Sequence, residues 1–148
     1  MTALYSAVIF FVVIDRFLKV LAVNLAGRQY DIIGDVFKFS LTKNSYIAFS
    51  LPLSGFWLNL IIGLVILILI YYLVRAWTRG ESLIAVSLLA VVLGAVSNLF
   101  DRLRFGYVID YFDLKYFTVF NLADALIISG VLGLLYLLNK KRPLKRSL

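Results

Sequence analysis

The chain has 148 residues, of which 63% are hydrophobic and only 16% charged, and its mean hydropathy is +0.98; soluble domains carry about a quarter charged residues, so the composition excludes a soluble domain and indicates an integral membrane protein. The net charge is +7, but five of the fifteen basic residues lie in the last nine positions, "KKRPLKR" and its neighbours, which favours a cytoplasmic flank over a nucleic-acid-binding surface. Cysteine and histidine are absent, which excludes disulfides, thiol or imidazole catalysis and the usual zinc ligands, so no metal or cofactor is expected.

Four apolar segments are each long enough to span a bilayer, which takes about 17–25 residues. They cover approximately residues 4–25, 56–74, 83–100 and 119–138. We therefore predict an all-α membrane protein whose four transmembrane helices form a single domain over 1–148. The first segment has three charges in its middle and no basic leader, which argues against a cleaved signal peptide.

An even number of crossings places both termini on one side of the membrane, and the basic C-terminal residues indicate that this side is cytoplasmic. The loops 26–55 and 101–118 then face outward. The first of these loops contains Gly34-Asp35, a pair suited to a two-residue hairpin turn, followed by the alternating "FKFSLT". This pattern predicts a small amphipathic β element at about 30–50, on the periplasmic surface of the membrane between the first two helices.

The first helix carries Asp15 and Lys19 at positions i and i+4, on the same face, whereas Arg16 points about 100° away and is free to snorkel. A charge inside a membrane helix costs about 3 kcal/mol or more unless it has a partner. Two interpretations stay open: a structural ion pair, or a pair that orients an active site.

Small residues at four-residue spacing predict close packing of the third and fourth helices. They are Ala90, Gly94 and Asn98 in one helix and Ala125, Ser129 and Gly133 in the other.

The third helix ends in "NLFDRLRFGYVID", where Asn98 and Arg102 are spaced to share a helix face. Gly106 supplies a flexible turn, after which the extended "YVIDYF" can bring Asp110 back toward the helices. In the fourth segment, Asn121 and Asp124 in "FNLADALI" are spaced to share another face near its outer end. We expect these polar groups to meet at the outer surface of the membrane.

Two carboxylates that approach closely in a poorly solvated site cannot both ionise, so the pair Asp110 and Asp124 offers an acid and a base together. Such a pair can activate water for peptide hydrolysis without histidine, cysteine or metal. A proton-coupled exporter and a structural or assembly protein are alternatives from the residues alone. A serine–lysine hydrolase using Ser50 or Ser97 is a weaker alternative, because no lysine has helix spacing to either serine.

Four sequence blocks resemble, in order, those of the lipoprotein signal peptidase family, signal peptidase II. They are "DRFLK", "TKNSYIAFS", "NLFDRLRFGYVIDYFD" and "FNLADALI". The resemblance covers nearly the whole chain. It implies a bacterial inner-membrane aspartyl endopeptidase that cleaves a prolipoprotein immediately before its diacylglyceryl-modified cysteine.

The resemblance assigns the catalytic dyad to Asp110 and Asp124. It further implies that six polar residues line the site or bind substrate: Asp15, Lys19, Asn44, Asn98, Arg102 and Asn121. Among the remaining acids, Asp101 is expected to be a salt-bridge partner at a helix end and Asp113 a solvated loop residue. The enzyme would act as a monomer on lipidated prolipoproteins within membrane lipid, with no nucleic acid and no cofactor. Tyr46-Ile47 depart from the family pattern and bear on the shape of the substrate entrance.

Overall fold

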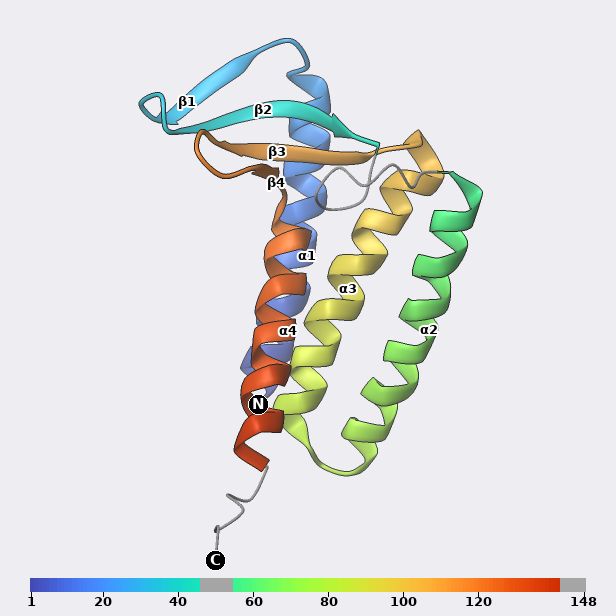
Figure 1. The fold of residues 1–148 in the computed structure, drawn as a ribbon. Coiled ribbons are helices and arrows are strands. Elements are labelled where there is room, and N and C mark those ends of the chain that lie inside the picture. Colours follow the sequence, from blue (N-terminus) through green and yellow to red (C-terminus); the bar gives the residue numbers. More distant parts are fainter. Residues whose placement is uncertain (46–54, 142–148) are drawn as a thin grey trace, which may run out of the picture.

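The computed structural model describes residues 1–45 and 55–141. Within these residues, four helices run side by side with a sheet across one end of the bundle (Figure 1). The helices are α1 (Thr2–Asn24), α2 (Phe56–Thr78), α3 (Ser82–Phe105) and α4 (Leu122–Lys141). The N-terminus and the C-terminal end of α4 lie at the end of the bundle away from the sheet.

Three of the described helices are long and apolar enough to cross a membrane, namely α2, α3 and the Leu122–Lys140 part of α4. Helix α1 is as long as α2, with 23 residues, but its Asp15, Arg16 and Lys19 set it apart from these three. The predicted four helices are therefore present, whereas only three of them meet the criteria of a membrane span by composition.

The prediction of an all-α protein is wrong, because four strands form an antiparallel sheet in the order β1-β2-β3-β4. The strands are β1 (Gln29–Ile33), β2 (Phe37–Asn44), β3 (Val108–Leu114) and β4 (Val119–Phe120). The predicted hairpin supplies β1 and β2. Residues expected to be an outer loop and the start of the fourth helix supply β3 and β4, which pair with the backbone groups that an edge strand would otherwise expose. The expected element extended to residue 50, and its last part, with Tyr46-Ile47, lies outside the described residues.

Both predicted turns hold the sheet in place. Residues 34–36 connect β1 to β2, one residue more than the two-residue turn expected, and Gly34 has a φ of 46°. Helix α3 continues to Phe105 and ends at Gly106, whose φ of 82° lies in the left-handed region. The Gly106 N–H donates to the Arg102 carbonyl at 3.0 Å, so the chain leaves the helix and begins β3 two residues later.

Helices α3 and α4 pack closely at two glycines. A Cβ at Gly94 would lie 2.6 Å from the Ala123 carbonyl oxygen, and one at Gly130 would lie 2.6 Å from the Ser87 carbonyl oxygen. The predicted face of α4 is correct only at Gly133, where a Cβ would lie 2.7 Å from Ser87 Oγ of α3. Ala125 and Ser129 are exposed, and the buried small residues are Ala123 and Gly130. Close approach of the two backbones is confirmed, but α4 is rotated relative to the expected face.

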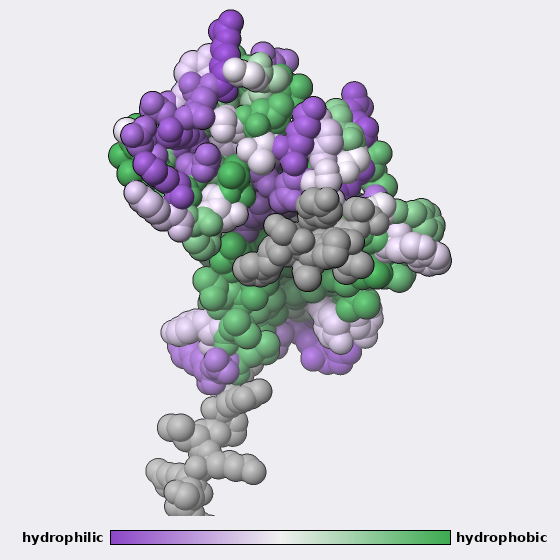
Figure 2. All heavy atoms as spheres, turned by 45° about the horizontal axis from the view of Figure 1, so that its top comes forward, coloured by the Kyte–Doolittle hydropathy of each residue, from purple (hydrophilic) through white to green (hydrophobic). Residues whose placement is uncertain are grey.

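The surface divides into a polar end and an apolar body. Hydrophilic residues gather over the sheet, and a band of hydrophobic residues covers the helices beneath it (Figure 2). Under the sheet, a cluster of Ala22, Phe39, Ile109 and Tyr111 is buried between α1, β2 and β3. This cluster fixes β3, the strand that carries Asp110, on the end of the helix bundle.

Candidate active site

Four charged side chains form an ion cluster between α1 and α3. Lys19 Nζ lies 3.2 Å from Asp15 Oδ2 and 2.8 Å from Asp101 Oδ2, and all three side chains are fully buried. Arg16 Nη1 lies 2.6 Å from Asp101 Oδ1, so the arginine expected to snorkel binds a carboxylate instead. The expectation that Asp101 is a salt-bridge partner is confirmed, with two cations rather than one.

Asp15 connects this ion cluster to the start of α4. Its Oδ1 accepts hydrogen bonds from the Ala123 backbone N–H at 3.1 Å and from the Tyr111 hydroxyl at 3.0 Å, while its Oδ2 accepts from Ser97 Oγ at 2.7 Å. A buried carboxylate needs such donors to offset the loss of its hydration. Asp15 therefore has two roles: it pairs with Lys19, and it accepts a hydrogen bond from an N–H group in the first turn of α4.

Asp124 lies on this first turn and belongs to a reciprocal capping arrangement. The Asp124 N–H donates to Asn121 Oδ1 at 2.8 Å, and the Asn121 N–H donates to Asp124 Oδ2 at 3.3 Å. This is the geometry of a capping box, in which the N-cap residue and the third helical residue satisfy each other's backbone donors. The spacing N-L-A-D thus starts the helix and fixes the carboxylate at its N-terminus, where the helix dipole favours negative charge.

Asp110 lies on β3, opposite Thr42 of β2, and is 2% exposed. Its Oδ1 accepts a hydrogen bond from Asn121 Nδ2 at 2.6 Å and its Oδ2 accepts one from Asn44 Nδ2 at 3.0 Å. The pKa of Asp110 is raised to about 6, mainly by burial and also by the charge of Asp124, whereas the hydrogen bonds from Asn44 and Asn121 oppose the rise. A carboxyl group with this pKa can hold or release a proton near neutral pH.

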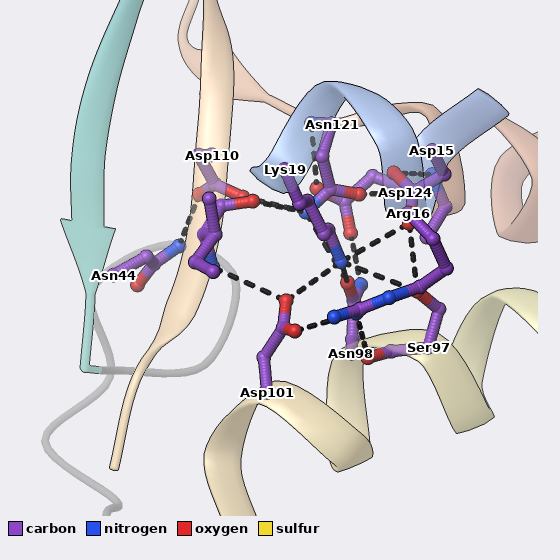
Figure 3. A network of polar contacts seen from close by, with 12 residues as sticks. Asp15, Arg16, Lys19, Asn44, Ser97, Asn98, Asp101, Asp110, Asn121 and Asp124 are labelled. Carbon is purple, nitrogen blue, oxygen red and sulfur yellow. Dashed lines mark hydrogen bonds and ion pairs between the residues drawn. The ribbon is translucent and has the colours of Figure 1, made fainter. Parts of the chain in front are cut away.

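Two asparagines link the two carboxylates. Asn121 Nδ2 donates to Asp110 and lies 3.2 Å from Asn98 Oδ1, and Asn98 Nδ2 donates to Asp124 Oδ1 at 2.7 Å. Lys19 Nζ donates to Asn98 Oδ1 at 2.8 Å, which leaves the Asn98 amide nitrogen to face Asp124. Figure 3 shows this network converging from α1, α3, β3 and the start of α4. The two acids therefore share one hydrogen-bonded frame.

The structure brings seven of the eight expected site residues into hydrogen bonds or ion pairs of this network: Asp15, Lys19, Asn44, Asn98, Asp110, Asn121 and Asp124. The eighth, Arg102, is close enough to Asp124 and Asp110 for their charges to interact. Asp113 is not the expected loop residue. It lies in β3, where it pairs with Lys38 of β2 and Val119 of β4.

The structure adds Tyr111 and Ser97 to the expected set. Tyr111 directly follows Asp110, and Ser97 directly precedes Asn98. This position next to a predicted site residue was the signal that the sequence offered. Ser97 Oγ lies 3.4 Å from Lys19 Nζ, a proximity that helix spacing within one segment could not indicate. Lys19 is paired with two carboxylates and the Ser97 hydroxyl donates to Asp15, so this pair lacks the free base that a serine nucleophile needs.

No group of three or more histidine, cysteine, aspartate or glutamate side chains suited to a metal ion occurs within residues 1–45 and 55–141. A cavity of about 540 Å³ lies at the opposite end of the bundle, between the α2–α3 turn and the end of α4. The frame around Asp110 and Asp124 is thus the candidate site on its chemistry rather than on cavity size.

Comparison with known proteins gives a consistent result. The sequence profile of a family described as signal peptidase (SPase) II matches residues 7–140. The chain is 34% identical to the lipoprotein signal peptidase of Halothermothrix orenii over 143 residues, covering 93% of this chain and 97% of that protein. It is also 34% identical to the lipoprotein signal peptidase of Caldanaerobacter subterraneus subsp. tengcongensis, covering 88% and 92% of the two chains.

Two solved structures share the fold. One, described as a bacterial membrane enzyme solved by the in meso method at 2.3 Å resolution, superposes with a TM-score of 0.82 at 20% identity and covers all of this chain and 94% of its own. The other, described in the same words at 1.9 Å resolution, gives a TM-score of 0.77 at 22% identity and covers 96% of each chain. The helices and the small sheet are therefore a known membrane-enzyme arrangement.

Proposed function

The chain belongs to the signal peptidase II family, and on that premise we propose that it is an aspartic endopeptidase that removes the signal peptide of diacylglyceryl-modified prolipoproteins. The bond cleaved lies immediately before the lipidated cysteine. One observation carries the aspartic mechanism: two carboxylates from different elements, Asp110 of β3 and Asp124 of α4, are held in one frame by Asn121 and Asn98.

In this mechanism the dyad shares one proton and acts on a water molecule. The ionised carboxylate takes a proton from the water, whose oxygen attacks the peptide carbonyl, while the protonated carboxyl donates to the carbonyl oxygen. These two transfers leave the first carboxyl protonated and the second ionised. As the gem-diol collapses and the C–N bond breaks, the first carboxyl donates its proton to the amine of the lipidated cysteine and the second takes the proton of a gem-diol hydroxyl, which becomes the new carboxyl carbonyl. Each member of the dyad thereby returns to its own starting protonation state.

The remaining polar residues hold this pair in place. Asn121 and Asn98 orient the two carboxylates, and Lys19 fixes the Asn98 amide from α1. Arg102 and Asn44 lie at the same end of the bundle, where they can bind the substrate backbone. The substrate signal helix enters sideways from the bilayer with its diacylglyceryl chains in lipid, and the sheet together with residues 103–116 covers the scissile region.

The proposed location is the bacterial inner membrane, with the protein as a monomer, both termini in the cytoplasm and the dyad at the outer face. Two observations support this orientation. The N-terminus and the end of α4 lie opposite the sheet (Figure 1), and basic residues lie at that end in Arg75, Arg79 and Lys140. The sequence after α4 is also basic.

The test is cleavage by the purified protein in detergent. A diacylglyceryl-modified prolipoprotein should release its signal peptide, whereas the unlipidated precursor should stay intact. Asp110→Asn and Asp124→Asn should each lower the rate by about 10²–10⁴-fold, the usual contribution of a general acid or base. Asp113→Asn, three residues along β3, is the matched control and should keep its activity.

Two results would count against the proposal. Substantial turnover in Asp110→Asn or Asp124→Asn would exclude the dyad. Absence of lipid-dependent cleavage, combined with flux driven by a pH gradient in liposomes, would favour an exporter instead.

A further inference from the structure

The start of α4 has an unusual set of hydrogen-bond partners. The first N–H groups of a helix lack acceptors within the helix and must find them elsewhere. In α4 three successive N–H groups donate to side chains: Leu122 to the Tyr111 hydroxyl at 3.0 Å, Ala123 to Asp15 Oδ1 at 3.1 Å and Asp124 to Asn121 Oδ1 at 2.8 Å. Two of these three acceptors come from outside α4 and its cap, so other elements determine where this turn lies.

Tyr111 makes two of the relevant bonds with a single hydroxyl group. It accepts from the Leu122 N–H and donates to Asp15 Oδ1, both at 3.0 Å, and the side chain has no solvent-exposed area. The residue follows Asp110 directly in β3. The hydroxyl therefore joins the strand of one catalytic carboxylate to the helix turn of the other, with α1 as the third element.

We propose that Tyr111 is a positioning residue of the dyad: its hydroxyl fixes the first turn of α4 against β3 and thereby sets how Asp124 faces Asp110. This inference rests on the proposed function for its effect on catalysis. The Tyr111 hydroxyl is occupied by Asp15 and the Leu122 N–H, so its role is to position the dyad rather than to act on the reacting atoms. Its effect passes through the Leu122 N–H and the capping box of Asn121 and Asp124.

The hydroxyl and the ring of Tyr111 have separable roles. The ring packs against Phe39 and Phe112, with centroid distances of 5.7 and 4.8 Å, and a phenylalanine would keep these contacts. Burial raises the pKa of the Tyr111 phenol and the Asp15 charge raises it further. The hydroxyl therefore stays protonated and donates a hydrogen bond to Asp15. Tyr111→Phe therefore removes one donor from Asp15 and leaves the Leu122 N–H without its acceptor, an expensive state in a buried site.

The test compares Tyr111→Phe with Tyr72→Phe. For Tyr111→Phe we expect kcat to fall about tenfold, which corresponds to about 1.4 kcal/mol, with KM within twofold because no substrate contact is lost. Tyr72 is exposed on α2, where its ring packs against Tyr71, and its hydroxyl makes no hydrogen bond within the described part of the chain. Its phenylalanine variant should match the wild type.

A second substitution tests the route. Leu122 is the first residue of α4, a position where proline is tolerated since its missing N–H is not needed by the helix. Leu122→Pro removes the donor that Tyr111 holds. In that background Tyr111→Phe should lower kcat by less than threefold, because the two changes remove the same bond.

Hydrogen exchange provides a readout that does not depend on cleavage. In Tyr111→Phe the amides of residues 122–125 should exchange faster than in the wild type, while those in the middle of α2 should not change. Wild-type kcat in Tyr111→Phe, an equal loss of kcat in both backgrounds, or unchanged exchange at the start of α4 would each overturn the inference. The Asp110→Asn and Asp124→Asn variants judge the proposed function separately.

Discussion

Asn121 serves two purposes with one side chain. Its oxygen caps α4 by accepting the Asp124 N–H, and its amide nitrogen donates to Asp110 across the site. Replacing it would remove a helix cap and one partner of a buried carboxylate together. The local sequence N-L-A-D is for this reason both a structural signal, readable as a helix start, and half of the proposed site.

The hydrogen bond from Asn44 to Asp110 leads to a prediction about how kcat/KM depends on pH. The pKa of Asp110 is raised to about 6, so its proton is held below that pH and leaves as the pH rises through it. Because the dyad needs one proton, kcat/KM should decline on this alkaline side. Asn44 lowers this pKa, and Asn44→Ala should therefore move the decline to higher pH.

The measurement is kcat/KM for the lipidated substrate as a function of pH in detergent, and the apparent pKa belongs to the coupled pair rather than to one carboxyl. Ser40→Ala, on the same strand but away from Asp110, is the control and should leave the profile in place. A decline that stays fixed or moves to lower pH in Asn44→Ala would contradict the assignment of Asp110 as the group that loses the proton.

At the scale of elements, the α3–α4 contact sets the depth and rotation of Asp124. Gly94 faces the carbonyl of Ala123, the residue directly before that carboxylate, and a Cβ there would lie 2.6 Å from it and 2.8 Å from Ile127 Cγ1. Backbone atoms cannot yield as a flexible side-chain end can. The glycine thus permits an approach that any other residue would prevent.

Gly94→Ala should destabilise the protein by about 1–3 kcal/mol, the usual cost of overpacking, and should lower kcat because α4 must shift. Gly63→Ala on α2 is the matched control: a Cβ there meets nothing within 4 Å, and the higher helix propensity of alanine should raise stability by up to about 1 kcal/mol. Thermal unfolding in detergent measures both. Equal melting temperatures for the two variants would refute the close-packing argument.

The elements themselves could largely be predicted from the sequence, whereas their pairing could not. Apolar length marks the helices, Gly34-Asp35 marks the hairpin, and Gly106 marks the end of α3. The extension of the hairpin by β3 and β4 escaped prediction, because strand pairing joins residues about 70 positions apart and leaves no local pattern. Val119–Phe120 pairs with nearby residues of β3 and looked like the start of a helix for a different reason, because an apolar pair fits either element.

The candidate carboxylates could be predicted from the sequence, whereas most of the hydrogen bonds and ion pairs that hold them could not. Spacing within a helix placed Asn98, Asn121 and Asp124 on usable faces, but bonds between helices, such as Lys19 to Asn98 or Arg16 to Asp101, have no signature in either segment alone. Tyr111 was missed because an aromatic residue in a strand is ordinarily read as core packing. Its role depends on the hydroxyl, which only the fold brings to the start of α4.

At the scale of the whole molecule, the chain permits a direct test of orientation, because it has no cysteine and any introduced thiol is unique. Tyr116→Cys, at a site 83% exposed between β3 and β4, should react with a membrane-impermeant maleimide added to intact spheroplasts. Arg79→Cys, at the α2–α3 turn, should react only after the membrane is opened. The wild-type chain gives the background, and the reverse pattern of labelling would invert the proposed topology.

The hydrogen bond from the Ala123 amide to Asp15 joins residues 108 positions apart. This separation in sequence determines when the site can form during synthesis. During synthesis α1 emerges first with Asp15, Arg16 and Lys19, and their partner Asp101 follows only with α3. The start of α4, which completes the coordination of Asp15, comes last. Contacts that close such long loops form late, so a partly made chain holds an unfinished frame and gains its peptidase geometry only when the last helix docks.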